Sequence, residues 1–296
     1  MLGGNVFGWN VDQAKANIIL DAFVELGGNA IDTADVYSAW APGNQGGESE
    51  TVIGHWLKAS GKRDKVVIAT KVGMWPKRPG LRRANIEAAF DDSLRRLQTD
   101  YVDLYQAHRD DDAVAPEEYM AAFDALVKAG KARAVGASNF TAARLSQALG
   151  ASAAGSLARF ETLQPEYNLM ERGIEAELVP LCVREGVSII PYYGLASGFL
   201  TGKYRHADDK AKSVRGGRMD RYLTDKGGRV LKALDAVSER RSARPAQVAL
   251  AWIMAKPAIA APIASVTNVE QLHEIMGAVR LTLSDADMAE LDAASA

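Results

Sequence analysis

Four reactive side chains lie at or just beyond the ends of apolar, strand-like runs in this sequence. They are a carboxylate, a phenol, an ammonium and an imidazole, carried by Asp32, Tyr37, Lys71 and His108. The carboxylate, the ammonium and the imidazole each end a different run, and the phenol follows the carboxylate by five residues. Groups of these types, delivered from separate strand ends, can transfer a proton to a carbonyl oxygen. The sequence therefore predicts an enzyme site for carbonyl chemistry.

Each of the four groups has a defined task in such a site. A phenol is a weak acid at neutral pH, and a neighbouring ammonium group stabilises the phenolate and makes the proton easier to give. We expect Lys71 to act in this way on Tyr37, and Asp32 to hold Lys71 charged and in place. His108 would donate to the carbonyl oxygen or relay a second proton. Each residue alone has a structural alternative, such as a helix cap or a packed aromatic ring, but their joint placement favours catalysis.

The elements that must position these groups alternate along the chain. Strand-like runs recur at intervals of mostly about 30 residues, at 30–31, 66–69, 102–105, 132–136, 160–163, 187–193 and 259–263. Amphipathic helical segments separate them, for example at 11–26, 83–97 and 117–128. This alternation predicts parallel strands joined by right-handed crossovers. We expect an α/β fold in which residues 1–296 form a single (β/α)8 TIM barrel, with the active site at its C-terminal mouth.

Two parts of this expected barrel are unusual. Seven runs are visible, so the eighth strand must be the first one, ending at Leu2-Gly3-Gly4. This first strand is apparently clipped: either the true start lies upstream of Met1, or the strand has only two or three residues. Residues 206–228 are the one long polar insertion, and we expect them to form a mobile loop over the barrel mouth.

The composition is that of an ordinary soluble globular protein. Apolar residues make up 48% and charged residues 24% of the chain, and the formal net charge is -2. Nothing in this balance requires nucleic acid or a membrane as a partner, and no apolar run reaches the length of about 18 residues that a membrane span needs. The N-terminus lacks the basic start and apolar stretch of a signal peptide, so we expect a cytoplasmic protein. The oligomeric state stays open.

The cysteine and histidine content argues against a metal site. The single cysteine, Cys182, excludes an intrachain disulfide and a cysteine zinc cluster, and we expect a buried inert thiol. The remaining histidines, His55, His206 and His273, have no ligand-like spacing. A metal-dependent barrel hydrolase is therefore not supported.

Several longer motifs resemble those of the aldo-keto reductases, and together they cover nearly the whole chain. They are NAIDTADVY (29–37), GESETVIGHWL (47–57), ATKVG (69–73), DLYQAHRDD (103–111), GASNF (136–140), ETLQPEYNLM (161–170) and PYYGLASGFLTGKY (191–204). The resemblance implies reduction of a small aldehyde or ketone with a nicotinamide cofactor. By position, the family's catalytic tetrad falls on Asp32, Tyr37, Lys71 and His108, with Tyr37 as the proton donor.

The resemblance also implies how the cofactor binds, extended across the barrel mouth without a Rossmann domain. No GxGxxG motif follows a strand in this chain. By position, Ser138, Asn139 and Gln164 would bind the carboxamide, and the nicotinamide ring would stack on Tyr192. The pyrophosphate would lie along a segment of small residues followed by a lysine: Gly194, Leu195, Ser197, Gly198 and Lys203.

One segment, 263–275, departs from the family pattern. Members that prefer NADP usually place a lysine or arginine there to pair with the 2'-phosphate, and this chain has none. Glu270 and Glu274 would repel a phosphate that they faced, whereas Arg215 or Arg218 of the long insertion could supply the missing charge. We expect NADP(H), with NAD(H) left open. The neutral groups that could hydrogen-bond the phosphate are Ser265, Thr267, Asn268 and Gln271.

The substrate pocket is less defined by the sequence. Trp9, Trp40 and Trp75 fall in loops after the first three strands and could form apolar walls, whereas Trp56 and Trp252 fall in helices and are expected in the core. No particular carbonyl compound is indicated. A second function also fits the resemblance: a cofactor-sensing regulatory subunit like the potassium-channel β subunits. The chain shows no N-terminal arm or polybasic segment of the kind such a subunit would use for docking.

Overall fold

Within the described residues, seven parallel strands form one curved sheet, and they lie side by side in chain order. This architecture comes from a computed structural model, which describes residues 1–212 and 216–296. The parallel order confirms the α/β barrel class expected from the sequence. The strands are β1 (Leu2–Gly3), β2 (Ala30–Asp32), β3 (Val67–Val72), β4 (Val102–Ala107), β5 (Ala132–Ser138), β6 (Phe160–Gln164) and β7 (Ser188–Ile189).

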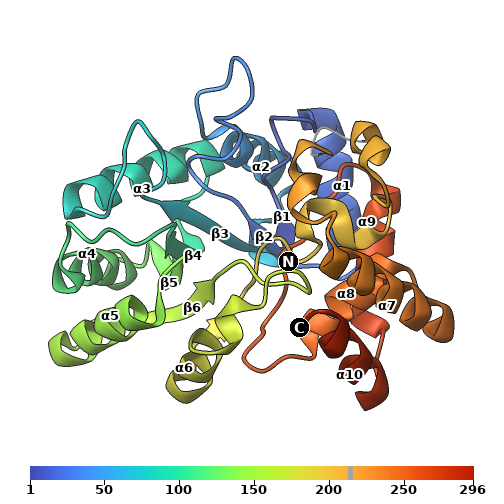
Figure 1. Ribbon diagram of the computed structural model, residues 1–296. Helices are drawn as coiled ribbons and strands as arrows, with labels where there is room; N and C mark the ends of the chain where they lie inside the picture. The colour runs from blue at the N-terminus through green and yellow to red at the C-terminus, as the bar shows by residue number, and fades with distance from the viewer. Residues whose placement is uncertain (213–215) are drawn as a thin grey trace.

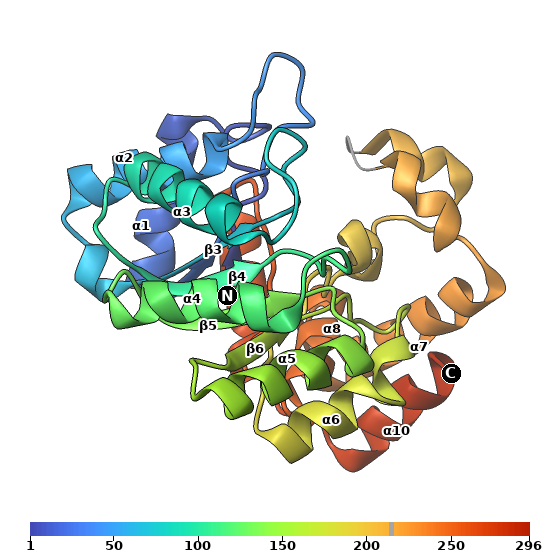
Figure 2. The same ribbon diagram turned by 90° about the vertical axis from the view of Figure 1, so that its left-hand side faces the viewer.

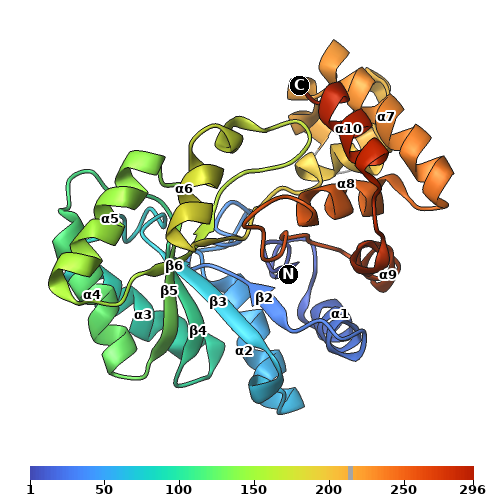
Figure 3. The same cartoon turned by 90° about the horizontal axis from the view of Figure 1, so that it is seen from below.

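Helices connect successive strands and cover the outside of the sheet (Figures 1 and 3). The connecting helices are α1 (Gln13–Glu25), α2 (Glu48–Ser60), α3 (Arg83–Leu97), α4 (Pro116–Lys128), α5 (Ala142–Gly155) and α6 (Leu178–Glu185). Helix α3 illustrates why they form, because Ile86, Phe90 and Leu97 recur at helical spacing and all are buried. The predicted boundaries 83–97 coincide with those of α3.

After β7 the chain forms a second group of helices, which lie together beside the sheet (Figure 1). They include α7 (Asp225–Arg241), α8 (Pro245–Met254), α9 (Val269–Met276) and α10 (Asp285–Ala294). Short 3-10 turns complete the set at Arg63–Lys65, Gly173–Glu175, Ala196–Thr201, Ala207–Lys212, Gly216–Arg221 and Gly277–Arg280. Trp252 of α8 is fully buried, as is Trp56 of α2, which confirms both as core residues.

The last strand expected from the sequence, 259–263, is not a regular strand. Only isolated bridges form here, Ile189 with Ile259 and Leu2 with Ala264, so this segment joins β7 to β1 and closes the sheet. Proline at position 262 removes a ladder donor, and Ala258 has a left-handed φ of 62°, which together explain the irregular pairing. The expected strand 187–193 is likewise shorter, with β7 at Ser188–Ile189, and β1 has two residues in the given sequence.

The described part of the expected loop 206–228 contains short helical elements. Its described part contains the 3-10 turns Ala207–Lys212 and Gly216–Arg221, and α7 already begins at Asp225 because Thr224 accepts a hydrogen bond from the amide of Gly227. Figure 2 shows these turns and the loop of residues 38–47 at the same end of the molecule. In the part of the chain that the structure describes, no helix is long and apolar enough to cross a membrane.

Candidate active site

Asp32 and Lys71 meet in the interior of the barrel, at the ends of neighbouring strands. Asp32 is the last residue of β2, and Lys71 lies near the end of β3, which pairs with β2 in parallel. The lysine Nζ lies 2.7 Å from Oδ1 of Asp32 and donates to Oδ2 at 2.8 Å. It also donates to the carbonyl oxygen of Thr33 at 2.8 Å. Both side chains are shielded from water, so each charge depends on the other.

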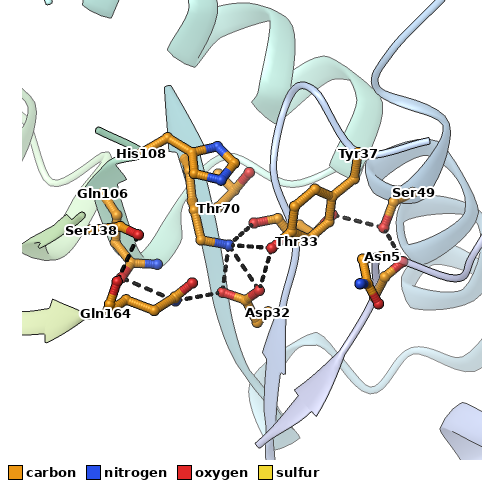
Figure 4. Close-up of polar contacts among 12 residues, drawn as sticks. Asn5, Asp32, Thr33, Tyr37, Ser49, Thr70, Gln106, His108, Ser138 and Gln164 are labelled. Carbon is orange, nitrogen blue, oxygen red and sulfur yellow. Dashed lines mark hydrogen bonds and ion pairs between the residues drawn. The ribbon is translucent and has the colours of Figure 1, made fainter. Parts of the chain in front are cut away.

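Tyr37 and His108 complete the cluster (Figure 4). The Tyr37 hydroxyl donates to Oδ2 of Asp32 at 3.0 Å and accepts from Nζ of Lys71 at 3.0 Å. His108 follows β4 directly, its amide donates to the carbonyl of Val72 at 2.8 Å, and its ring centroid lies 5.9 Å from that of Tyr37. The structure thus brings together the four residues that the sequence singled out.

Burial sets the protonation states in this cluster. It raises the pKa of Tyr37 well above its usual value, and the nearby Asp32 raises it further. The phenol is therefore protonated in this arrangement. Burial lowers the pKa of His108 well below its ordinary range, with Lys71 and Arg109 adding to the effect, so the imidazole is neutral. A neutral imidazole can still donate one hydrogen bond.

One large cavity of about 1070 Å³ begins at this cluster. Asp32, Tyr37 and His108 form part of its wall at one end, and Thr267, Gln271 and Ile275 form part of it near helix α9. The volume exceeds that of a typical pocket for a drug-sized ligand and suits an extended dinucleotide together with a small substrate.

Three amide and hydroxyl side chains expected to bind a carboxamide line this cavity: Ser138, Asn139 and Gln164. Asn139 donates to the carbonyl of His108 at 3.0 Å and accepts from the hydroxyl of Tyr192 at 2.8 Å. Gln164 donates to Oδ1 of Asp32 at 2.9 Å. Their contacts tie the amide groups to the charged cluster, so a ligand bound here would be held at a fixed position relative to Tyr37.

The segment after β7 has a strained backbone. Ala196, Ser197 and Gly198 all have left-handed φ values, of 47°, 57° and 98°. Such a conformation costs about 1–3 kcal/mol for each residue other than glycine and collects at binding sites. The amides of Ala196 and Gly198 donate to the carbonyls of Tyr193 and Leu195. Ser197 and Gly198 line the cavity, together with the expected residues Gly194, Leu195 and Lys203.

The cavity wall near α9 contains a cation that the sequence analysis missed. Arg244 caps the N-terminus of α8 and lines the cavity, as do Ser265, Thr267 and Gln271. Its position beside α9 arises from the packing of α8 on α9, which no local motif reveals. Arg218 instead contacts the hydroxyl of Tyr193 at 2.8 Å and lines a separate cavity of about 530 Å³. Arg215, the other arginine considered, lies outside the described residues.

The three tryptophans expected at the substrate pocket occupy different positions. Trp40 is 49% exposed and lines the large cavity, where Met74 and Pro76 also lie. Trp9 packs edge-on against Trp40 with ring centroids 5.9 Å apart. Trp75 is not part of the cavity lining, and its Nε1 donates to the carbonyl of Gln45 at 2.9 Å. Among the described residues, no group of three or more acidic, histidine or cysteine side chains is arranged to hold a metal ion.

Comparison with known proteins places this chain in a family. The model of the Aldo/keto reductase family matches residues 1–296. The chain belongs to the aldo/keto reductase family. Its members are oxidoreductases that use nicotinamide cofactors and act on small carbonyl substrates.

Similar curated proteins span nearly the whole chain. Protein tas of Escherichia coli is 33% identical over 320 residues, which cover 99% of this chain and 92% of that protein. Norsolorinic acid reductase B of Aspergillus parasiticus is 32% identical over 295 residues, 96% of this chain and 75% of that protein. Aryl-alcohol dehydrogenase [NADP(+)] of Phanerodontia chrysosporium is 32% identical over 297 residues, 94% of this chain and 75% of that protein.

Proposed function

We propose that this protein reduces an aldehyde or ketone to the alcohol, with NADPH as the hydride source and Tyr37 as the proton donor. The observation that carries the proposal is the buried contact of Asp32, Lys71 and Tyr37 at one end of a cavity large enough for a dinucleotide. A reduced nicotinamide supplies the hydride when bound. The small residues and Lys203 that line the cavity after β7, and the amide groups near His108, support binding of such a cofactor along this cavity.

The residues of this chain would then handle the proton. Tyr37 holds its proton because burial and Asp32 raise the pKa of the phenol, so it is in the donor form when substrate arrives. As the phenol hydrogen turns from Asp32 to the carbonyl oxygen, Nζ of Lys71, 3.0 Å from the phenol oxygen, stabilises the phenolate that forms. Asp32 balances the charge of Lys71, and the neutral His108 offers a second donor to the carbonyl oxygen.

The preference for NADPH over NADH would rest on Arg244. The nicotinamide must lie near Tyr37, so the adenosine of an extended dinucleotide reaches the part of the cavity near α9, where Arg244, Thr267 and Gln271 form the wall. Arg244 is a cation with a planar guanidinium that matches phosphate geometry. Thr267 and Gln271 are neutral, and Glu274, which also lines this part of the cavity, would repel a phosphate that it faced, so the pairing would fall to Arg244. The Phanerodontia chrysosporium relative is named as an NADP(+) enzyme, which also supports this cofactor.

Calorimetric titration with NADPH and NADH tests the cofactor assignment. A charge-assisted contact is worth about 1.5–3 kcal/mol, so Arg244→Ala should weaken NADPH about ten- to a hundredfold and spare NADH. Arg95→Ala, at an exposed position on α3 outside the cavity lining, is the matched control and should change neither constant. Arg218→Ala tests the alternative, in which an arginine of the long insertion binds the 2'-phosphate. If that variant alone loses NADPH affinity, Arg244 is not the phosphate ligand.

Turnover separates a reductase from a regulatory subunit that only senses the nucleotide. A panel of aromatic and aliphatic aldehydes and ketones, followed by the loss of reduced-nicotinamide absorbance, should give multiple turnovers with at least one class. Tight nucleotide binding without turnover on any carbonyl would instead favour the sensing function. Absence of binding by either nucleotide would refute both.

A further inference from the structure

The carboxyl group of Asp35 lies in the interior without the partners that a buried charge needs. Asp35 is fully buried, and neither of its carboxyl oxygens has a hydrogen-bond partner of normal geometry among the described residues. The backbone amide of the next residue, Val36, lowers the pKa of Asp35, but by less than burial raises it. An ionised carboxylate without donors or water is strongly disfavoured, so the site selects the protonated form.

The neighbouring buried carboxylate already uses the nearby cation. Glu50 of α2 is fully buried, and its Oε2 accepts a hydrogen bond from Nε of Arg96 on α3 at 2.6 Å. Its Oε1 accepts from the hydroxyl of Thr70 at 2.5 Å. With Glu50 satisfied on both oxygens, Arg96 compensates one negative charge and not two. Among the residues that the structure describes, Asp35 therefore has no cation of its own to pair with.

The remaining charged and titratable groups around Asp35 do not change this result. Lys71 of β3 is paired with Asp32, and Tyr105 of β4 is neutral because burial raises its pKa well above the usual value. Burial is the main cause that raises the pKa of Asp35 to about 8, and Glu50 adds to it. Arg96 and Lys71 oppose the shift without cancelling it.

Asp35 lies in the short segment that presents the candidate proton donor. Residues 33–37 lead from β2 to Tyr37, and the backbone of this segment hydrogen-bonds to β3. The amide of Asp35 donates to the carbonyl of Lys71 at 3.3 Å, and the carbonyl of Thr33 accepts from Nζ of Lys71 at 2.8 Å. A change in the charge of Asp35 therefore acts on the backbone that sets the position of the Tyr37 phenol.

We propose that Asp35 is a positioning residue whose neutral carboxyl keeps residues 33–37 seated on β3, and whose deprotonation displaces Tyr37 while leaving nucleotide binding intact. An ionised Asp35 would repel Glu50 and compete with it for Arg96 in the buried interior. The carboxyl of Asp35 takes no direct part in the proposed proton transfer. Only the kinetic experiment below rests on the proposed function, and the other two experiments use the protein without cofactor or substrate.

The first experiment observes the proton itself. In protein labelled with carbon-13 at the aspartate carboxyls, one resonance should titrate near pH 8 in the wild type, far above the usual value of about 3.9. It should be missing in Asp35→Asn, which assigns it. In Glu50→Gln the same resonance should move to lower pH, because Arg96 then faces a single carboxylate. If every aspartate of the wild type titrates below about pH 6, the proposal is wrong, even if no variant folds.

The second experiment uses stability. Because the pKa of folded Asp35 is raised, the folded state alone holds this proton between about pH 4 and pH 8, and stability is lost as the pH rises through that window. The unfolding constant of the wild type relative to Asp35→Asn should rise by up to about tenfold per pH unit and level off above about pH 8. Asp100→Asn, at an exposed position, is the control and should follow the wild type. Parallel curves for Asp35→Asn and the wild type would overturn the proposal.

The third experiment distinguishes positioning from a purely structural role. In the wild type, kcat should fall as the pH rises through about 8, while the dissociation constant of the nucleotide stays constant. Asp35→Asn should move the midpoint of this decline upward by about one pH unit or more. An unchanged midpoint, in a protein whose first two experiments succeed, would show that Asp35 acts on stability alone. A protein without any turnover would instead refute the proposed reductase function and leave the first two results standing.

Discussion

Lys71 and Asp32 form an ion pair that is closed off from water. The Nζ of Lys71 lies 2.7 Å from Oδ1 of Asp32, and the side chains are 0% and 1% exposed. Burial lowers the pKa of Lys71, and Asp32 opposes that shift, so the charged state of the lysine depends on its partner. Both members of the pair also hydrogen-bond to the Tyr37 hydroxyl. The same two residues therefore affect the stability of the barrel interior and the proposed proton transfer.

Removing one partner of this pair should be costly. Lys71→Met leaves Asp32 as an uncompensated buried charge, and breaking such a pair typically costs about 3–5 kcal/mol of the free energy of unfolding. The double variant Asp32→Asn/Lys71→Met removes both charges and should recover most of that loss without recovering turnover. Urea unfolding and steady-state kinetics on the two proteins check this. A loss below about 1 kcal/mol in Lys71→Met would indicate that water reaches the pair, as at surface salt bridges.

His108 should make stability depend on pH on the acid side. Burial, Lys71 and Arg109 lower the pKa of the folded imidazole, so below the unfolded value of about 6.5 only the unfolded chain takes up this proton. Stability should therefore be lost as the pH falls below about 6.5, by up to about 1.4 kcal/mol per pH unit. The difference in unfolding free energy between wild type and His108→Gln, measured at several pH values, isolates this contribution. A difference that does not vary between about pH 5 and 7 would mean that the folded imidazole titrates normally.

Trp40 should contribute to substrate binding and not to nucleotide binding. Its ring lies edge-on to Tyr37, with centroids 6.0 Å apart, and forms part of the cavity wall near the cluster. Burying a large side chain against a ligand is worth about 1.5–3 kcal/mol, so Trp40→Ala should raise KM for an aromatic aldehyde about ten- to a hundredfold.

The controls for this prediction are a small aliphatic aldehyde and a second variant. The KM for the aliphatic compound should change much less, and the dissociation constant of NADPH should stay the same. Trp75→Ala removes a ring that lies outside the cavity lining and should leave KM unchanged. Equal effects of the two substitutions would mean that both tryptophans act through the fold of their loops.

The sequence was sufficient to predict the strand-end residues of the site. Asp32, Lys71 and His108 follow apolar runs whose length and spacing define parallel strands, and the carboxyl ends of such strands meet at one mouth. Tyr37 follows Asp32 closely enough to share that mouth. Each of these relations depends on neighbouring residues or on the order of the strands, so it can be predicted from a single sequence.

Features that depend on packing could not be predicted in this way. The apolar run 259–263 reads as a strand, yet Pro262 and the left-handed Ala258 leave only isolated bridges. Arg244 reaches the cavity through the packing of α8 against α9, which has no signature in a local motif. The pKa of Tyr37 is raised by burial and by Asp32, and the degree of burial is known only from the folded chain.

The most direct test of the proposed reaction is transfer of deuterium from the cofactor to the product. Wild-type protein, supplied in separate runs with NADPH deuterated on either face of the nicotinamide C4 and a reducible aldehyde, should place deuterium on the carbinol carbon from one face and not from the other. Tyr37→Phe should bind NADPH with nearly unchanged affinity and form product at less than about a tenth of the wild-type rate, since general acid catalysis typically contributes a factor of about 100 or more. Deuterium-free alcohol from the wild type in both runs, or product formation by Tyr37→Phe at the wild-type rate, would contradict the account.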